Sequence, residues 1–346
     1  MRGLFVGISK AYRYSLDAKA FADPKNRDEI MTTLDALARN AEQLQSHGGG
    51  LDPSFDYMKR SLSRDAHDAL ESFKAFNDVG TRFILSDITE NCVTCHTKLP
   101  ATRPFEAGKQ FLEDIDVKSF PAPARAKLQV ASRQFSDAVK TYEEIILSKK
   151  TTAEDLMVFD IFDNYLSVCI GAMNDLKRPV PTLDKFVGRT DMPENVTTYA
   201  RAWIGSLEAL NLGVATGGEL AAARRLVTDA RKKSPTRNDR SGLVDFIGSI
   251  TLLHRHLRSN PKDDVSVAES YYLLGVAESY VYRTYWVSET EYLLDHSIRV
   301  APKSDVAKQA IAYLEEYRSS QTSVPARVIP PDMQVNIEEL RKLTEQ

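Results

Sequence analysis

The chain has 346 residues, of which 42% are hydrophobic and 27% are charged, and its formal net charge is −3. This composition is ordinary for a globular protein, and the length suggests two domains. The charge balance leaves no global basic field, so we expect no nucleic-acid partner. No apolar run approaches the ~20 residues that cross a bilayer, so we expect no transmembrane segment.

Apolar residues recur at three- and four-residue steps in four stretches of the first hundred residues, which predicts four amphipathic helices. The glycine run 48–50 breaks the pattern between the second and the third. Four helices of this length with short loops favour an antiparallel bundle. The four stretches carry Leu4, Phe5, Ile8, Tyr12 and Leu16; Ile30, Met31, Leu34, Leu37, Ala38, Ala41 and Leu44; Phe55, Met58, Leu62, Ala66, Leu70 and Phe73; and Val79, Phe83, Ile84, Ile88, Cys92 and Cys95.

The last of these helices contains Cys-x-x-Cys-His, formed by Cys92, Cys95 and His96. Two thiols three positions apart can each form a thioether to one porphyrin edge, and the adjacent imidazole can then bind the iron. A structural zinc site usually needs four ligands, and Cys169 is the only other cysteine. The motif therefore predicts one covalent haem c with His96 as the metal ligand. A reducible disulfide or a bare thiol pair is the alternative.

The four predicted helices, with the stretch 91–100 around the motif, resemble the class II c-type cytochromes, the cytochrome c-prime group. The resemblance covers about the first 100 residues. It implies that His96 is the proximal ligand and that Cys92 and Cys95 hold the haem. Family members typically follow the haem histidine with an aromatic and then a basic residue, whereas this chain has Leu99 and Pro100 there.

In that family the residue on the distal side of the iron comes from the first helix. The resemblance places Phe5 there, flanked by Leu4 and Ile8, and none of these side chains can bind iron. It therefore implies an apolar distal pocket and a five-coordinate iron. Other sixth ligands stay open, and the candidates are Met31, Met58, His67 and His47.

The pattern predicts an interdomain joint at residues 105–123 and helices throughout the chain beyond them. This second region also shows signs of a degenerate repeat. Three short stretches match parts of a tetratricopeptide repeat, so the region 105–317 resembles a tetratricopeptide-type α-solenoid. An unrelated helical bundle is the alternative. The matching residues are Phe135, Ala138, Tyr142 and Ile145; Gly218, Leu220, Ala223, Val227, Ala230 and Pro235; and Leu274, Gly275, Leu294, Ser297 and Pro302.

A basic cluster lies in the repeat-like region. Such a cluster is usually a solvated helix face, and the alternative is a docking surface for an acidic partner. Residues 318–346 are expected to form a proline-containing linker and a short docking helix with Ile337, Leu340 and Leu343. The basic cluster contains Arg224, Arg225, Arg231, Lys232 and Lys233.

These patterns predict an all-α protein: a haem-binding four-helix bundle at 1–104, a repeat region at 105–317 and a C-terminal segment. We expect an exported electron carrier that docks on a redox partner protein or membrane-associated complex. No catalytic acid, base or nucleophile accompanies the motif, so we expect no enzyme. The first ten residues have too short an apolar core for a signal peptide, so a periplasmic location is inferred from the motif alone. A gas-binding sensor for nitric oxide or carbon monoxide, and a structural or assembly subunit, are the alternatives.

Overall fold

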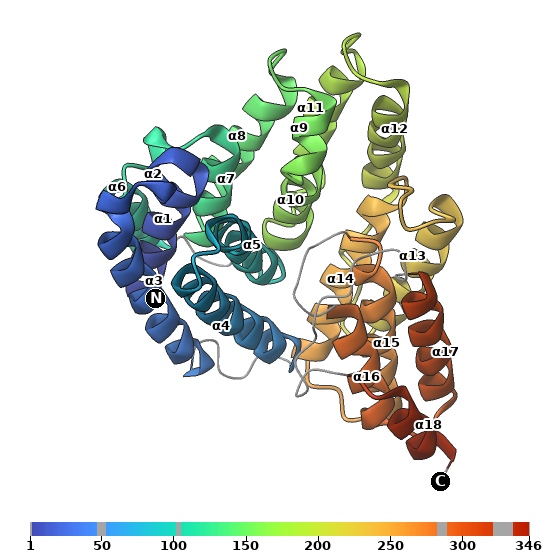
Figure 1. Cartoon of the computed structure of the whole chain (residues 1–346). Helices are drawn as coiled ribbons and strands as arrows, with labels where there is room; N and C mark the ends of the chain where they lie inside the picture. The colour runs from blue at the N-terminus through green and yellow to red at the C-terminus, as the bar shows by residue number, and fades with distance from the viewer. Residues whose placement is uncertain (1, 47–52, 102–104, 282–288, 321–334, 346) are drawn as a thin grey trace. The chain divides into compact units, whose positions relative to one another are not determined.

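The computed structural model describes residues 2–46, 53–101, 105–281, 289–320 and 335–345. All helices and turns in these ranges belong to an all-α fold without strands (Figure 1), which confirms the predicted class. No helix within the described ranges has the length and apolarity that a membrane span requires. The chain forms two compact units, Met1–Val168 and Cys169–Gln346, which are described in turn.

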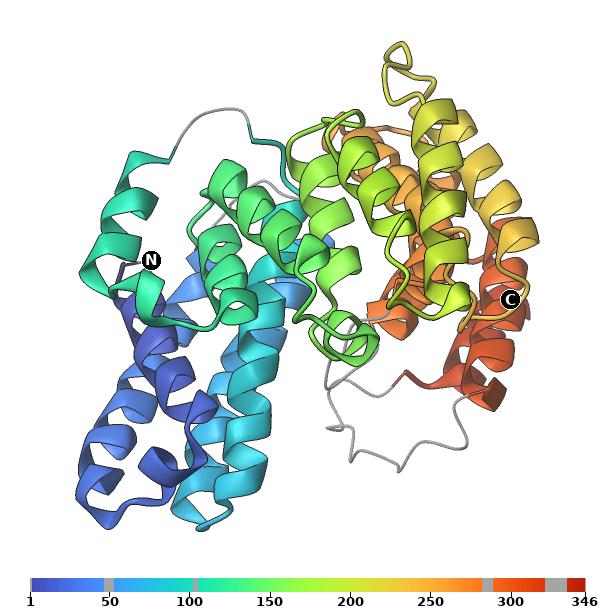
Figure 2. The ribbon, with the colours of Figure 1, turned by 90° about the horizontal axis from the view of Figure 1, so that it is seen from above.

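Four helices form the first part of unit 1, as the sequence predicts, and Figure 2 shows them, from blue to cyan, running beside one another. The first helix packs against the second and the fourth, and the third packs against the same two. A short helix, α2 (Ala18–Ala22), follows the first and is capped by the Asp17 carboxylate, which accepts hydrogen bonds from two backbone N–H groups. The four long helices are α1 (Arg2–Leu16), α3 (Arg27–Glu42), α4 (Pro53–Lys74) and α5 (Asp78–Thr97).

The first turns of α5 differ from the predicted apolar stripe. Val79 is 79% exposed and Phe83 is 53% exposed, although the periodicity assigns both to the core. The buried line of this helix runs through Leu85 and Ile88 on its opposite side. The prediction that Val79 and Phe83 are buried was therefore wrong. The first turns of α5 have apolar residues on two sides, and other helices cover only one of these sides.

Five further helices complete unit 1, and the segment predicted to be a joint is part of its core. Leu112 and Phe120 pack in one apolar cluster with Phe5 and Tyr12 of α1. The sequence places a boundary at residue 104, whereas the boundary between the compact units lies at Val168. The five helices are α6 (Glu106–Asp114), α7 (Ala122–Ala131), α8 (Phe135–Leu147), α9 (Ala153–Val158) and α10 (Ile161–Ser167).

Unit 2 is a series of helices that pack in sequence order. Most helices contact the next one along the chain, and α12–α14, α13–α15 and α15–α17 also contact each other across one helix. Helices α13, α15 and α17 therefore form one layer of the unit. Its helices are α11 (Pro179–Val187), α12 (Glu194–Ala209), α13 (Glu219–Lys233), α14 (Leu243–Arg258), α15 (Asp264–Glu278), α16 (Glu289–Val300), α17 (Asp305–Ser320) and α18 (Ile337–Glu345).

A glycine allows α15 and α16 to approach closely. A Cβ atom on Gly275 would lie 2.9 Å from Cγ of Leu294, which is tighter than carbon atoms tolerate. The Ser297 hydroxyl of α16 donates a hydrogen bond to the Ala268 carbonyl of α15 at 2.6 Å. Small residues at this crossing therefore set the distance between the two helices.

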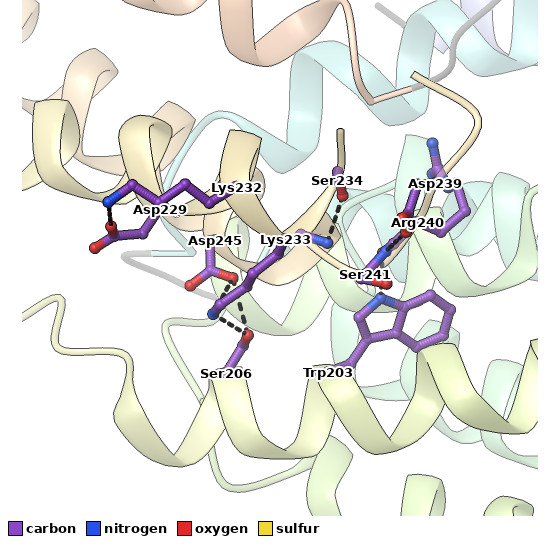
Figure 3. Close-up of polar contacts among 11 residues, drawn as sticks. Trp203, Ser206, Asp229, Lys232, Lys233, Ser234, Asp239, Arg240, Ser241 and Asp245 are labelled. Atoms are coloured by element: carbon purple, nitrogen blue, oxygen red, sulfur yellow. Dashed lines mark hydrogen bonds and ion pairs between the residues drawn. The ribbon is translucent and has the colours of Figure 1, made fainter. Parts of the chain in front are cut away.

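A polar network ties α12, α13 and α14 together (Figure 3). The Lys233 ammonium donates to Ser206 Oγ at 2.9 Å and to Asp245 Oδ2 at 2.8 Å. The Ser206 hydroxyl donates to the same carboxylate at 2.8 Å. Nearby, Trp203 Nε1 donates to the Arg240 carbonyl at 2.7 Å. Because the lysine is paired with a carboxylate, it fixes three helices and is not a free base for the serine.

The C-terminal helix predicted at the end of the chain is present as α18, and it packs against α16 and α17. Leu340 is fully buried at this contact. Two ion pairs surround it, Arg299–Glu339 at 2.8 Å and Arg341–Glu315 at 2.7 Å. The predicted proline-containing linker falls largely on residues 321–334, which lie outside the described residues.

Candidate cofactor-attachment site

The Cys-x-x-Cys-His motif occupies the last two turns of α5. Cys92, Cys95 and His96 are each half-buried, while Val93 and Thr94 between them are fully buried. Helical geometry places the two cysteines and the histidine on the same side of α5 as Leu85 and Ile88. The three reactive side chains thus share one helix face and remain partly accessible.

The imidazole of His96 is oriented by a backbone carbonyl from another helix. Its Nδ1 lies 3.2 Å from the carbonyl oxygen of Val130, near the end of α7. A carbonyl only accepts hydrogen bonds, so this contact requires the proton on Nδ1 and leaves the lone pair on Nε2. Metal-ligating histidines characteristically have this second hydrogen bond, which fixes the tautomer and the ring orientation.

The Cys92 thiol is held in its protonated form. Its Sγ lies 3.7 Å from the Ile88 carbonyl oxygen, to which the S–H can donate. Burial raises the pKa of Cys92 to about 12, and the neighbouring Cys95 and Glu90 add to this rise. A thiol with such a pKa is not a ready thiolate nucleophile or thiolate metal ligand at neutral pH.

A buried ion pair lies one half-turn before the motif. Glu90 of α5 pairs with Lys127 of α7, and their side chains are only 11% and 6% exposed. Asn164 of α10 donates a further hydrogen bond to the Glu90 carboxylate at 3.3 Å. Burial acts to lower the pKa of Lys127, but the Glu90 carboxylate outweighs it and raises that pKa above its usual value. The buried pair and the Asn164 hydrogen bond therefore fix α5 against α7 and α10.

A second buried polar contact fixes α5 against α4. The Asn91 amide donates to the Asp65 carboxylate at 2.5 Å, and both residues are at most 2% exposed. Two polar contacts directly before the motif, made by Glu90 and Asn91, therefore join α5 to separate helices. Sequence reasoning missed both contacts, because the partners are 26 and 37 positions apart and no local spacing marks them.

The three predicted distal residues, Leu4, Phe5 and Ile8, are all buried on α1. Phe5 stacks on Phe111 of α6 with ring centroids 5.5 Å apart. The other members of its apolar cluster come from α1, α6, α7 and the segment between α6 and α7. The structure thus brings Phe5 next to α6 and α7, and a distal role for these three residues stays a prediction.

The alternative sixth ligands are dispersed. His67 is half-exposed on α4, and its Nε2 pairs with the Glu42 carboxylate at 2.9 Å. Met58 is buried on α4, and Met31 is half-buried on α3. His47 lies outside the described residues. Within the described part of the chain, no three or more histidine, cysteine or acidic side chains group in a way that could hold a bare metal ion.

Comparisons with protein-family models, with curated proteins and with solved structures find no match for this chain. A functional conclusion therefore depends on the residues and the geometry described above.

Proposed function

We propose that this chain is an exported monohaem c-type cytochrome that carries single electrons and docks on a larger assembly through its helical repeat region. The observation that carries the proposal is the hydrogen bond from His96 Nδ1 to the Val130 carbonyl. It orients the imidazole that follows Cys-x-x-Cys and leaves Nε2 with the lone pair that an iron ligand needs.

The residues at the end of α5 fit a covalent haem. Cys92 and Cys95 would each add a thiol across one vinyl group, which forms a C–S and a C–H bond and needs no oxidant. His96 would bind the iron through Nε2. When bound, the haem would supply reversible one-electron transfer. The chain would contribute a fixed axial ligand and a buried, low-dielectric surrounding.

The packing of α1, α3, α4 and α5 supports a four-helix bundle of the cytochrome c-prime kind, because each helix contacts two of the others. The alternate-helix contacts of α13, α15 and α17 support an α-solenoid of the tetratricopeptide kind. Solenoids of this kind serve mainly to bind proteins or peptides, which suits a docking role.

The direct test is expression of the full chain with the signal sequence of an exported protein, in bacteria that attach haem c. Intact mass should increase by one haem, and the haem should resist extraction by acidic acetone. The double variant Cys92→Ser/Cys95→Ser should lose this mass and the reduced absorption bands. A matched variant, Cys169→Ser, should keep both. Haem that stays non-extractable in the double variant would sink the attachment proposal.

A vacant distal site for nitric oxide or carbon monoxide is the second candidate, because Leu4, Phe5 and Ile8 are apolar and buried. The two functions differ in the absorption spectrum of the ferrous protein. An electron carrier with a filled sixth position should be indifferent to carbon monoxide. A five-coordinate iron should shift its Soret band on addition of the gas. His96→Ala should abolish the native spectrum in both cases without removing the covalent haem.

A further inference from the structure

Unit 2 carries an open groove of about 490 Å³ across the layer formed by α13, α15 and α17. Its basic wall comes from α13, with Arg224, Arg231 and Lys232. Tyr272 of α15 and Gln309 of α17 form the opposite side. Three consecutive layer helices thus contribute to one hollow, and α13 contributes most of the charge.

The two arginines of this wall are held in place by neighbours. Arg224 donates to the Glu269 carboxylate with Nε and Nη2, at 2.5 and 2.8 Å. The guanidinium of Arg231 lies 5.5 Å from the centre of the Tyr313 ring. Tyr313 in turn packs edge-on against Tyr272, with ring centroids 6.4 Å apart. Positioned guanidinium groups lose little conformational entropy on binding and match carboxylates with paired N–H donors.

The charge of the wall exceeds that of its acidic neighbours. Three cations line the groove, whereas Glu269 is the one carboxylate among the described residues that line it. Arg224 uses two of its five N–H donors on Glu269, so three can serve a ligand. Lys232 pairs only at the surface with Asp229, and its side chain is 72% exposed. The groove is therefore suited to an anionic ligand.

The spacing of the arginines favours an extended peptide over a compact anion. Arg224 and Arg231 are seven positions apart, which is about 10.5 Å along a helix axis. In a polyproline II segment, side chains three positions apart share a face and lie about 9.3 Å apart. Two acidic side chains at such a spacing can each meet one arginine. The Tyr272 ring can pack against a peptide residue between the two acidic ones. The Gln309 amide can form a hydrogen bond with the peptide backbone there.

We infer that this groove binds an extended acidic segment of a partner protein, with acidic residues three positions apart. The inference names the partner chemistry for the docking role and so rests on the proposed function. Binding itself needs no haem, so a chain that fails to attach haem can still bind the segment. The attachment and docking parts of the function can therefore fail separately.

The test is fluorescence anisotropy with the full chain and the labelled peptide acetyl-Glu-Pro-Leu-Glu-Pro-Leu-Glu-amide. The same peptide with glutamine in place of glutamate is the neutral control. We expect saturable binding of the acidic peptide that weakens as salt rises. The neutral peptide should bind at least about tenfold more weakly. The intact mass of the same preparation reports haem attachment independently.

Two variants locate the site. Arg231→Glu and Lys232→Glu should each weaken peptide binding about tenfold or more, because each reverses a charge in the wall. Lys232→Glu removes only an exposed surface pair, so it keeps the test valid if Arg231→Glu disturbs the packing on Tyr313. Arg225→Glu is the matched control, since this exposed neighbour on α13 is not among the residues that line the groove. Arg225→Glu should change the affinity for the peptide less than twofold, because exposed charges act only weakly at a distance.

Three results would overturn the inference. The first is no binding at millimolar peptide. The second is equal loss of binding in Arg225→Glu, which would indicate a diffuse charge effect. The third is tighter binding of a single-stranded oligonucleotide at the same residues, which would assign the groove to nucleic acid.

Discussion

The charged residues next to the motif of unit 1 and those along α13 of unit 2 differ in how far they are buried. Next to the motif of unit 1, the charged pair Glu90 and Lys127 is almost fully buried between α5 and α7. Along α13 of unit 2, Arg224 and Lys232 are mostly exposed. Buried charges fix a geometry, because any displacement leaves an uncompensated charge in a low dielectric. Exposed charges contribute little to stability and remain available to a ligand. The buried pair of unit 1 therefore fixes a local geometry, whereas the exposed cations on α13 of unit 2 remain accessible.

The largest effect is expected at the buried pair. Lys127→Met leaves the Glu90 carboxylate buried without its partner, and we expect a loss of about 3–5 kcal/mol in the free energy of unfolding, measured by urea denaturation. The double variant Lys127→Met/Glu90→Leu should regain most of it. The exposed Lys140→Met, which breaks a pair with Asp137, should cost less than about 1 kcal/mol. Equal losses for the two lysine variants would remove the contrast between buried and exposed charges.

The next effect concerns the thiol of Cys92 in haem-free chain. Its pKa of about 12, against the usual 9.0, lowers the thiolate fraction at pH 8 about 1000-fold. A more basic thiolate is also more nucleophilic, so alkylation by iodoacetamide should slow about 30-fold relative to unfolded chain. Fragment-ion mass spectrometry of the peptide that contains both thiols separates Cys92 from Cys95.

The raised pKa of Cys92 also makes the free energy of unfolding depend on pH. The folded chain holds the Cys92 proton more tightly than the unfolded chain does. Its contribution to the free energy of unfolding is therefore complete below pH 9 and is lost as pH rises towards 12. Haem attachment should abolish this contribution, because a thioether carries no proton. A rapid, pH-independent reaction of Cys92 in folded chain would contradict the described environment.

A smaller effect is expected where unit 2 relies on close packing. Gly275→Ala places a Cβ 2.9 Å from Leu294, and we expect a loss of about 1–3 kcal/mol by thermal or urea denaturation. Gly205→Ala on α12 is the matched control, since nothing lies within 4 Å of its added Cβ. That change should be neutral or stabilise by up to about 1 kcal/mol, as helix propensity predicts. Equal effects would mean that α15 and α16 are not in close contact.

The smallest effect is expected in the network that joins α12, α13 and α14. Asp245→Asn keeps the size of the side chain but removes the charge that Lys233 and Ser206 contact. We expect a loss of about 1–2 kcal/mol in the free energy of unfolding, since one partner is half-exposed. Asp229→Asn, at an exposed pair with Lys232, should change it by less than about 0.5 kcal/mol.

The sequence predicted most of the helices because apolar residues at three- and four-residue steps report one buried face. The spacing of Cys92, Cys95 and His96 also marks them as a candidate attachment site, and that role stays a prediction. It failed at Val79 and Phe83, whose apolar side of α5 is left uncovered. It could not predict the contact of His96 with Val130 or that of Glu90 with Lys127. Such partners lie more than thirty positions apart, and only the fold brings them together.

The carbonyl of Val130 lies 34 positions after the imidazole that it orients. A fragment cut at residue 104 would keep both thiols and His96 but would lose this acceptor, together with Lys127 and the aromatic neighbours of Phe5. In such a fragment the His96 imidazole would lack the contact that fixes its ring orientation in the full chain. The smallest piece of this chain that keeps the surroundings of the motif intact should therefore extend through α7 and up to Val168.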